Sequence, residues 1–458
     1  MLPHEYASFD AVGLRELLET GEVSAPEVEA AARAALLEVN PYLNALTGAL
    51  FDEPLDSNPA GALAGVPFLI KDSGPVARGV GFAAGSRAIQ GAVAESDSPI
   101  MALFRAAGFV TLGQTTAPEL SLSFATESRL HGVTRNPWAL GRGVGGSSGG
   151  AAALVAAGAV PVAHANDGAG SIRVPASACG LVGLKPGRGV TPSAPRSLAA
   201  GAVLSAEFAV TRTIRDAAAV LDVLTDGSLF STSMSKNPGP SRVALATAAW
   251  SGIPVDPQVM AAAESVAQTL QWIGHFVDRA TPSIDADLIV EGEMLAIVNA
   301  GRAVLAASRQ ADPGLFEGVS RAVLREARAT TDTDIAAAVA TQESLTRTVD
   351  EFFADHELLV TPTLGQLPAP HGTLDYDNTD YTVRGWLSRM FEYGPFTALF
   401  NVTGHPAISL PLGESREGLP IGVQVVAAHG REGLLLQVAA QLEQAMPWAG
   451  RQPSVFVD

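Results

Sequence analysis

This chain of 458 residues has little cysteine and little positive charge. Cys179 is the only cysteine, so no intrachain disulfide can form, and its small apolar neighbours predict a buried thiol. Lys and Arg number 29 against 47 Asp and Glu, which gives a net charge of −18. Nucleic acids and anionic membranes bind through basic patches, so this balance argues against both as the main partner. It favours a cytoplasmic enzyme that acts on neutral or cationic substrates.

The sequence also lacks long hydrophobic runs. The longest, at residues 151–163, contains a proline and is shorter than the roughly 20 residues that span a bilayer. The first residues, "MLPHEYASFDAVG", have neither a basic nor an apolar region, so we expect no signal peptide. A membrane is therefore not expected among the partners.

Short apolar segments alternate with helical patterns along the chain. "GVPFLIK" at 65–71 and "FVTLG" at 109–113 are typical of strands, and between them Ser98, Pro99 and Gly108 mark the two ends of a helix. Strand, helix and strand in this order predict a parallel pair. Further strands are expected at 159–165, 241–247, 357–362, 407–411 and 421–428, and helices at about 148–158, 256–273 and 431–446. This alternation predicts an α/β fold with helices on both faces of a sheet.

Other segments are predicted to be helical throughout. Ser24 and Glu27 form a capping box before an alanine-rich helix that runs to Val39. Residues from about 285 to 355 also have helical patterns, without a clear boundary on either side. We expect this segment to form a helical cap on the sheet, within one domain that spans residues 1–458.

The glycine-serine stretch "GVGGSSGGAAA" at 143–153 has three interpretations: a linker, a phosphate-binding loop, or the position of a nucleophilic serine. A linker is excluded because the stretch runs directly into an apolar helix. Residues 141–146 fit a dinucleotide-binding pattern, with Asp167 at a suitable distance after Gly146, but that pattern requires a preceding strand. "TRNPWAL" occupies this place and contains Pro137, so no strand is expected there. A Walker-type loop is excluded because its Lys-Ser/Thr pair is missing.

A nucleophilic serine is the third interpretation. Residues 145–149 fit the G-x-S-x-G turn of histidine-dependent hydrolases, and the required histidine could be any of four downstream, namely His356, His371, His405 and His429. Another serine fits better, because Ser171 follows further along the chain in "HANDGAGSIRVPASACGLVGLKP". Its small neighbours let the backbone N–H groups of 168–171 point at one spot, which is how an oxyanion hole is built.

Lys71 ends the apolar strand of "GVPFLIKD". Free lysine, with a pKa near 10.4, is a poor base at neutral pH, and burial among apolar residues lowers that pKa. A serine hydroxyl needs such a base within reach before it can act as a nucleophile. Ser171, Ser147 and Lys71 therefore form a set of nucleophile, relay and base.

With these residues the chain resembles the amidase signature family of serine hydrolases. The resemblance rests on "LAGVPFLIKD", "TRNPW", "GGSSGG", "DGAGSIRVPASACGLVGLKP", "LLVTPTLGQLPAP", "FNVTGHPAISLP" and "GLPIGVQVV", in the family's order and over nearly the whole chain. It implies a single large α/β domain with a mixed, twisted sheet covered by helices on both faces. The sequences of these motifs resemble those of nylon-oligomer and aryl-amide hydrolases more than those of fatty-amide hydrolases.

The resemblance also implies a role for each motif residue. Ser171 matches the nucleophile, Ser147 the bridging serine that follows a cis peptide bond, and Lys71 the general base. Ser148 matches a residue that positions the lysine. The oxyanion loop is matched by the backbone of Gly168, Ala169, Gly170 and Ser171. Ala169 departs from the glycine of many members, and its methyl group narrows the loop.

The implied function is that of an amidase. Such an enzyme hydrolyses C–N bonds of anilides and oligoamides through an acyl-enzyme, with aryl carbamates (urethanase activity) and esters (esterase activity) as further substrates. The resemblance implies a small-molecule substrate, no cofactor and no metal, and leaves monomer and homodimer open. Three alternatives also stay open: the glutamine-hydrolysing subunit of a tRNA-dependent amidotransferase, the histidine-dependent hydrolase, and an inactive binding protein.

Other polar and aromatic residues have simpler interpretations. Asp167 and Arg173 are expected to form a structural ion pair. His164 is expected to be a packed histidine rather than a metal ligand, and His405 is expected to pack near the site without transferring protons. The segment 371–400 is rich in aromatic residues, and we expect it either to line the substrate pocket or to pack in the core. Its aromatic residues include Tyr376, Tyr381, Trp386, Phe391 and Tyr393.

Overall fold

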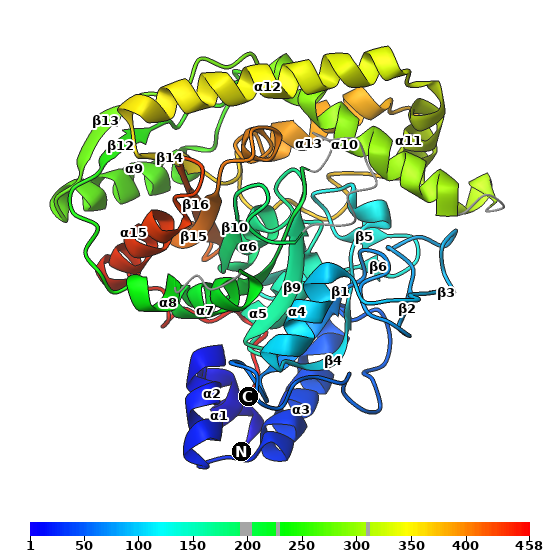
Figure 1. The fold of residues 1–458 in the computed structure, drawn as a ribbon, viewed down its shortest axis with the longest axis vertical. Coiled ribbons are helices and arrows are strands. Elements are labelled where there is room, and N and C mark those ends of the chain that lie inside the picture. The colour runs from blue at the N-terminus through cyan, green and yellow to red at the C-terminus, as the bar shows by residue number, and fades with distance from the viewer. Residues whose placement is uncertain (193–203, 226–229, 308–311) are drawn as a thin grey trace.

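An eight-stranded mixed sheet forms the centre of the structure, a computed structural model that describes residues 1–192, 204–225, 230–307 and 312–458 (Figure 1). The strand order is β13 (Phe276–Arg279), β12 (Arg242–Leu245), β14 (Leu358–Pro362), β16 (Pro420–Ala427), β15 (Ala407–Glu414), β10 (Val182–Lys185), β11 (Ala206–Thr211) and β9 (Val162–Asp167). β12 is parallel to β13 and β14, and the other neighbours are antiparallel. The predicted α/β fold with a mixed sheet and flanking helices is confirmed.

A separate two-stranded sheet carries Lys71 at its end. β1 (Pro67–Lys71) and β4 (Val110–Thr115) pair in parallel, and α4 (Pro99–Ala107) connects them, as predicted. The Ser98 hydroxyl caps α4, and Gly108 ends it with a left-handed φ of +88°. β1 lies beside β9, so the end of β1 reaches the edge of the large sheet.

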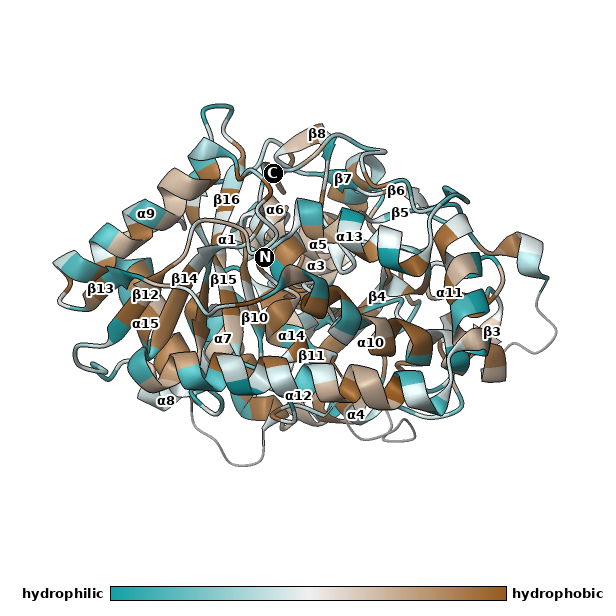
Figure 2. Ribbon diagram, turned by 90° about the horizontal axis from the view of Figure 1, so that it is seen from above, coloured by the Kyte–Doolittle hydropathy of each residue, from teal (hydrophilic) through white to brown (hydrophobic). Residues whose placement is uncertain are grey.

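Helices surround these sheets. The capping box of Ser24 and Glu27 starts α3, and this helix continues past the predicted end at Val39 because Pro41 is accommodated within it. Besides α4, the α-helices that the described residues form outside 286–355 are α1 (Pro3–Ser8), α2 (Ala11–Thr20), α3 (Ala25–Leu43), α5 (Gly149–Ala156), α6 (Arg173–Cys179), α7 (Ile214–Leu224), α8 (Phe230–Ser233), α9 (Pro257–Trp272), α13 (Val383–Tyr393), α14 (Leu399–Val402) and α15 (Glu432–Ala445). Figure 2 shows hydrophobic residues gathered on the central strands and hydrophilic ones recurring along the outer helix α9.

The segment predicted as a helical cap consists of α10 (Ala286–Ala307), α11 (Gly318–Ala329) and α12 (Asp332–Asp355). α10 packs against α11, α12, α13 and α14. In Figure 1 these helices lie at the end of the molecule opposite α1, α2 and both termini. The helical character is therefore confirmed, while a cap function stays a prediction.

Three small hairpins complete the fold, and one of them corrects an expectation. They are formed by β2 (Gly81–Phe82) with β3 (Ala92–Val93), β5 (Glu127–Ser128) with β6 (Gly132–Val133), and β7 (Arg135–Asn136) with β8 (Ala139–Gly143). The prediction of no strand before the glycines was wrong, because Pro137 lies in the turn between β7 and β8 and interrupts neither. β8 pairs with β7 and is not a strand of the large sheet.

The interior is apolar, and the single cysteine belongs to it. Cys179 is fully buried, and burial raises the pKa of its thiol, which confirms the prediction of a buried thiol. Among the described residues, we find no helix with the length and apolar character that crossing a membrane requires.

Candidate active site

The glycine-serine stretch forms a tight, buried turn before α5. Gly145 has a left-handed φ of +75°, and a Cβ on Gly146 would lie 2.6 Å from the carbonyl oxygen of Ser123. The peptide bond between Gly146 and Ser147 is cis, as the family resemblance implied. Ser147 and Ser148 are fully buried. The turn therefore fixes two serine side chains in the interior of the molecule.

Lys71 reaches this turn from the end of β1. Its side chain is fully buried, with Nζ 2.7 Å from Ser147 Oγ and 2.6 Å from Asn166 Oδ1. Burial lowers the pKa of Lys71 to about 7, although nearby carboxylates, Glu207 foremost, oppose the shift. A substantial share of Lys71 side chains is therefore neutral at neutral pH, and the neutral amine is the form that accepts a proton.

A closed ring of hydrogen bonds surrounds Lys71. Asn166 Oδ1 accepts from Lys71 Nζ, and Asn166 Nδ2 donates to Glu207 Oε1 (3.4 Å). The other carboxylate oxygen of Glu207 lies 2.8 Å from His164 Nε2, and His164 Nδ1 accepts from the backbone N–H of Lys71 (3.3 Å). The prediction of a packed His164 is confirmed. The ring holds both the backbone and the amine of Lys71 in place.

The sequence prediction did not include Asn166 or Glu207. Asn166 stands directly before Asp167 in the quoted motif, and Glu207 is the single charged residue of the apolar strand "AEFAVT". A charged residue in an apolar strand was the available signal. Which residues Glu207 contacts depends on the register of β11 against β9, and this register places Glu207 opposite Asn166.

Ser171 lies on the turn between β9 and α6, and 6% of its surface is exposed. The backbone N–H of Ser148 donates to the carbonyl oxygen of Ser171 (3.3 Å), which joins the two serine motifs. In the parts of the chain that the structure describes, no hydrogen bond links the hydroxyl of Ser147 to that of Ser171. The structure thus joins Lys71 to Ser147 directly, and it joins the two serine turns through the backbone.

Four consecutive backbone donors are free at this turn. Among the described residues, the N–H groups of 168–171 have no protein acceptor. Gly170 has φ of +147°, and a Cβ there would lie 2.5 Å from Thr397 Oγ1. Thr397 Oγ1 in turn donates to the carbonyl oxygen of Ala169 (2.7 Å). These contacts hold the turn open from behind while its donors stay unpaired.

A buried ion pair supports the turn from below. Asp167 and Arg173 are both fully buried, with a closest N–O distance of 2.8 Å. Asp167 also accepts from the backbone N–H groups of Ile172 and Arg173. Although burial raises the pKa of Asp167, the Arg173 guanidinium holds it at about 2. The predicted structural ion pair is confirmed.

Ser148 contacts the segment that carries Asn166 and does not contact Lys71 directly. It stands directly before α5, but its hydroxyl makes no capping hydrogen bond. Instead, Ser148 Oγ donates to the backbone carbonyl of Asn166 (3.3 Å). This contact connects Ser148 to Asn166, whose side chain accepts from Lys71 Nζ, and a positioning role for Ser148 stays a prediction.

Comparison with known proteins identifies the family of this chain. The profile of the Amidase family matches residues 22–436. The chain belongs to the amidase family. It is 39% identical to the 6-aminohexanoate-cyclic-dimer hydrolase of Paenarthrobacter ureafaciens, over 98% of this chain and 97% of that protein. The chain is therefore a C–N hydrolase of the amidase family.

Solved structures give the same result. A 6-aminohexanoate cyclic dimer hydrolase superimposes with a TM-score of 0.92 at 37% identity, over 98% of this chain and 99% of that one. A bacterial aryl acylamidase of the amidase signature family superimposes with a TM-score of 0.83 at 26% identity, over 96% and 97%. A chain of the glutamyl-tRNA(Gln) amidotransferase from Thermotoga maritima, at 24% identity, shares the fold with a TM-score of 0.75, over 100% of this chain and 98% of that one.

The four histidines that follow the serine motifs in this amidase contact residues other than Ser147 and Ser171. Among the described residues, none forms a hydrogen bond or ion pair with Ser147 or Ser171. His356 contacts Asp278, and His371 contacts Glu127 and a backbone carbonyl. His405 and His429 both lie near a different carboxylate, that of Asp350. The geometry gives the histidine-dependent interpretation no support.

The aromatic segment of the amidase lies mainly in its core. Tyr376, Trp386 and Tyr393 are buried in one apolar cluster, and Trp386 Nε1 donates to the carbonyl of Leu122. Phe391 is only partly buried, and like Ala169 it packs against two apolar clusters. Core packing thus explains most of the segment, and Phe391 stays a candidate for lining a substrate pocket.

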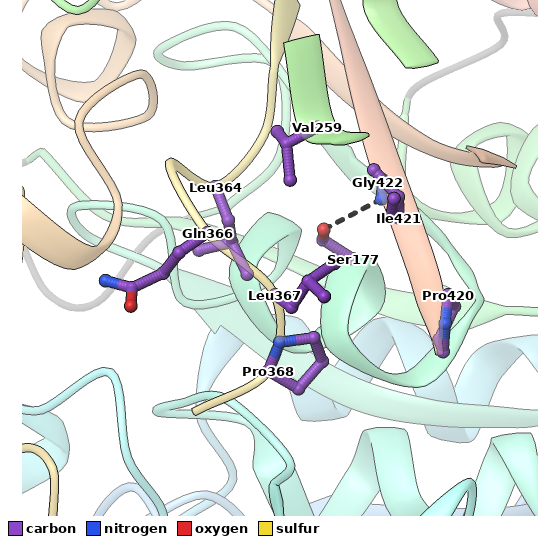
Figure 3. Close-up of a pocket in the computed structure, with 9 residues that line it drawn as sticks. All are labelled: Ser177, Val259, Leu364, Gln366, Leu367, Pro368, Pro420, Ile421 and Gly422. Carbon is purple, nitrogen blue, oxygen red and sulfur yellow. Dashed lines mark hydrogen bonds between the residues drawn. The ribbon is translucent and has the colours of Figure 1, made fainter. Parts of the chain in front are cut away.

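Figure 3 shows a small pocket whose lining does not include Lys71, Ser147 or Ser171. It is lined by Ser177, Val259, Leu364, Gln366, Leu367, Pro368, Pro420, Ile421 and Gly422. The Ser177 hydroxyl accepts a hydrogen bond from the N–H of Gly422 (3.0 Å), and the lining has no titratable side chain. This pocket has neither a base nor a free nucleophile and is not a catalytic site.

Proposed function

We propose that this amidase cleaves amide C–N bonds through an acyl-enzyme on Ser171, with Ser147 as the proton relay and Lys71 as the base. The observation that carries the proposal is the buried contact of 2.7 Å between Lys71 Nζ and Ser147 Oγ. A pKa of about 7 makes Lys71 a base that works near neutral pH. Ser148 helps to position Lys71 through Asn166.

The reaction begins with proton transfer along this relay. Neutral Lys71 takes the proton of Ser147, and Ser147 takes that of Ser171 as the Ser171 oxygen attacks the carbonyl carbon. The tetrahedral intermediate collapses when the relay returns the proton to the nitrogen, the C–N bond breaks and the amine leaves. Water then attacks the acyl carbon, the relay again accepts a proton, and Ser171 is released as the free hydroxyl.

The negative charge of the intermediate is stabilised by the oxyanion turn. Its donors are the backbone N–H groups of Gly168, Ala169, Gly170 and Ser171, which have no other acceptor among the described residues. Backbone donors that are already oriented stabilise developing charge without reorganisation. Loss of one such donor typically costs about 2.7–4 kcal/mol of transition-state stabilisation.

The substrates are proposed to be small amides with an apolar acyl part. Ala169 and the partly buried Phe391 give the turn an apolar neighbourhood, and the ring of Phe124 lies 6.4 Å from that of Phe391. Relatives are named for 6-aminohexanoate cyclic dimer and for aryl acylamides, so oligoamides and anilides are the first candidates. Esters and aryl carbamates form the same kind of acyl-enzyme and are further candidates.

Covalent labelling tests the nucleophile. A sulfonyl fluoride should modify Ser171, as seen by mass spectrometry of peptides. Ser171→Ala should keep the fold but lose about 10⁴-fold or more of the activity. The control is Ser177→Ala. Ser177 lies on α6 and lines the small pocket of Figure 3, so this variant should stay active and be labelled normally on Ser171. A label on Ser147 in the wild type would contradict the assignment.

A substrate screen tests the reaction class. The purified chain is assayed alone on 6-aminohexanoate cyclic dimer, p-nitroanilides, an aryl carbamate, esters and glutamine. Turnover of the cyclic dimer or an anilide without tRNA, ATP or another protein supports the proposal. If glutamine were the one substrate hydrolysed, and if its hydrolysis required partner proteins, the amidotransferase alternative would be favoured.

A further inference from the structure

Three side chains able to bind a metal meet away from the proposed catalytic residues. Asp350 belongs to α12, His405 precedes β15, and His429 follows β16. Their ligand atoms lie within 4.8 Å of one another. Asp350 Oδ1 is 3.1 Å from His405 Nε2 and 3.7 Å from His429 Nε2. The helical segment and the large sheet thus contribute jointly to one cluster.

The buried Nε2 atom of His405 is available to bind a ligand. His405 is fully buried, and its Nδ1 lies 2.9 Å from Thr403 Oγ1. Its Nε2 faces Asp350 without the geometry of a hydrogen bond, so within the described residues this nitrogen has no hydrogen-bond partner. A buried polar atom without a partner costs free energy, and an ion bound at this atom removes the cost.

The spacing suits a tetrahedral ion. Bonds of about 2.0–2.2 Å from a zinc ion to nitrogen and oxygen place neighbouring ligand atoms about 3.4 Å apart. The two distances from Asp350, 3.1 and 3.7 Å, lie on either side of that value. The side chains of Asp350 and His429 are half exposed, at 50% and 43%, so an ion can enter from solvent and keep a water as its fourth ligand.

We propose that Asp350, His405 and His429 form a zinc-type site, distinct from the catalytic residues, that fastens α12 to the ends of β15 and β16. Two imidazoles and one carboxylate are typical ligands of Zn²⁺ and of neighbouring divalent transition metals. The Thr403 hydroxyl beside His405 Nδ1 serves as the outer partner that fixes the ring orientation of a metal-binding histidine.

Charged groups of both signs lie around the cluster. The charged groups that act on the two histidines are Lys185, Arg188, Asp350 and Glu432. Lys185 and Arg188 oppose any cation, while Asp350 and Glu432 favour one. Because these opposite charges offset one another, the ligand chemistry decides which ion binds: an ion with high affinity for imidazole is expected, and Mg²⁺ and Ca²⁺ are not.

The proposed site would act on stability and not on the reaction. Binding to the folded chain alone raises the unfolding temperature, by an amount that grows with the ratio of metal to dissociation constant. Because α12 carries one ligand and the strand ends carry two, the bound ion would resist separation of the helix from the sheet. The catalytic relay contains none of the three ligands.

The test titrates Zn²⁺ into the full-length chain after chelator treatment and dialysis. Calorimetry should give one bound Zn²⁺ per chain, and thermal unfolding should show an increase in the midpoint with Zn²⁺ and none with Mg²⁺. His429→Ala and Asp350→Asn should each weaken binding by more than about tenfold and remove the midpoint shift. Both residues are partly exposed, so the variants are expected to fold.

Two control variants make the result specific. His4→Ala removes an exposed histidine elsewhere, and Asp355→Asn removes an exposed carboxylate from the same helix, α12. Both should bind Zn²⁺ like the wild type. Absence of stoichiometric binding, or equal affinity in His429→Ala and the wild type, would overturn the proposal.

Discussion

At the scale of single residues, the proposed chemistry depends on Lys71. Its amine contacts Ser147 and Asn166 in the interior, where the charged form is poorly solvated. Lysine at the end of an exposed strand would keep its proton at neutral pH and could not accept another. The same residue buried in this ring becomes a base.

The rate should therefore depend on pH through the neutral fraction of Lys71. Burial lowers the pKa of Lys71 from 10.5 to about 7, and only the unprotonated amine accepts a proton. Activity is thus expected to be low below that value, to rise as pH increases through about 7, and to stay high on the alkaline side. A pH–rate profile of kcat/KM on a non-ionising anilide measures this. A profile that falls between neutral and mildly alkaline pH would remove Lys71 as the base.

Replacement of Lys71 should affect amides more than esters. Lys71→Ala removes the group that takes and returns the proton, and an amine leaving group needs that proton whereas an alkoxide does not. We expect a loss of roughly 10²–10⁴-fold on an amide and a smaller loss on the ester of the same acid. Equal losses on both substrates would mean that Lys71 acts only toward the nucleophile.

The motifs that carry the proposed catalytic residues could be recognised in the sequence, and the side chains that contact Lys71 from other strands could not. Lys71, Ser147 and Ser171 stand in local patterns of small residues and apolar strands, which the chain order reveals directly. Glu207 lies in a strand with no motif, and its relation to Lys71 depends on pairing between β9 and β11. Such pairing is set by packing between distant segments, which a single sequence does not show.

At the scale of elements, the edge of the large sheet positions the base. β9 and β11 place Asn166 opposite Glu207, and β1 lies on the other side of β9. The turn after β9 then carries the free backbone donors and Ser171. A single strand edge thus supplies partners for Lys71, the proposed base, and leads into the turn proposed to bind the oxyanion.

Neutralising Glu207 should move the pH profile. The Glu207 carboxylate raises the pKa of Lys71 and opposes the larger effect of burial. Glu207→Gln keeps a side chain of similar shape without the charge, so the pKa of Lys71 falls and the rising limb of the profile shifts to lower pH. Glu264→Gln, an exposed carboxylate on α9, is the control and should leave the profile unchanged. A shift toward higher pH would contradict the electrostatic role of Glu207.

Local signals predicted several helices and five strands of the large sheet, β9, β12, β14, β15 and β16, but not β10, β11, β13 or the order of the strands. Ser98 and Gly108 mark the ends of α4 because capping residues act locally. β10, by contrast, lies between β11, which follows it closely along the chain, and β15, which belongs to the C-terminal part. The β7–β8 hairpin was missed because Pro137 was taken to exclude a strand, whereas it lies in the turn between two short strands.

At the scale of the whole molecule, Arg173 connects the oxyanion turn to the C-terminal part of the chain. Besides Asp167, its guanidinium donates to the carbonyl of Thr397 and to the side chains of Asn401 and Gln424. Asn401 also donates to Asp167, which closes the network. Segments that are far apart along the chain therefore meet behind the proposed nucleophile.

Breaking this buried pair should destabilise the entire fold. Arg173→Met leaves the Asp167 carboxylate without its cationic partner in the interior, and such changes cost about 3–5 kcal/mol in the free energy of unfolding. The matched control is Glu417→Gln, which breaks the exposed pair with Arg142 and should cost about 1 kcal/mol or less. Urea denaturation followed by circular dichroism measures both. Because Arg173 holds the turn that carries Ser171, we also expect Arg173→Met to lose activity at urea concentrations where it is still folded. A loss of stability no larger than that of the control would show that the network does not hold the fold together.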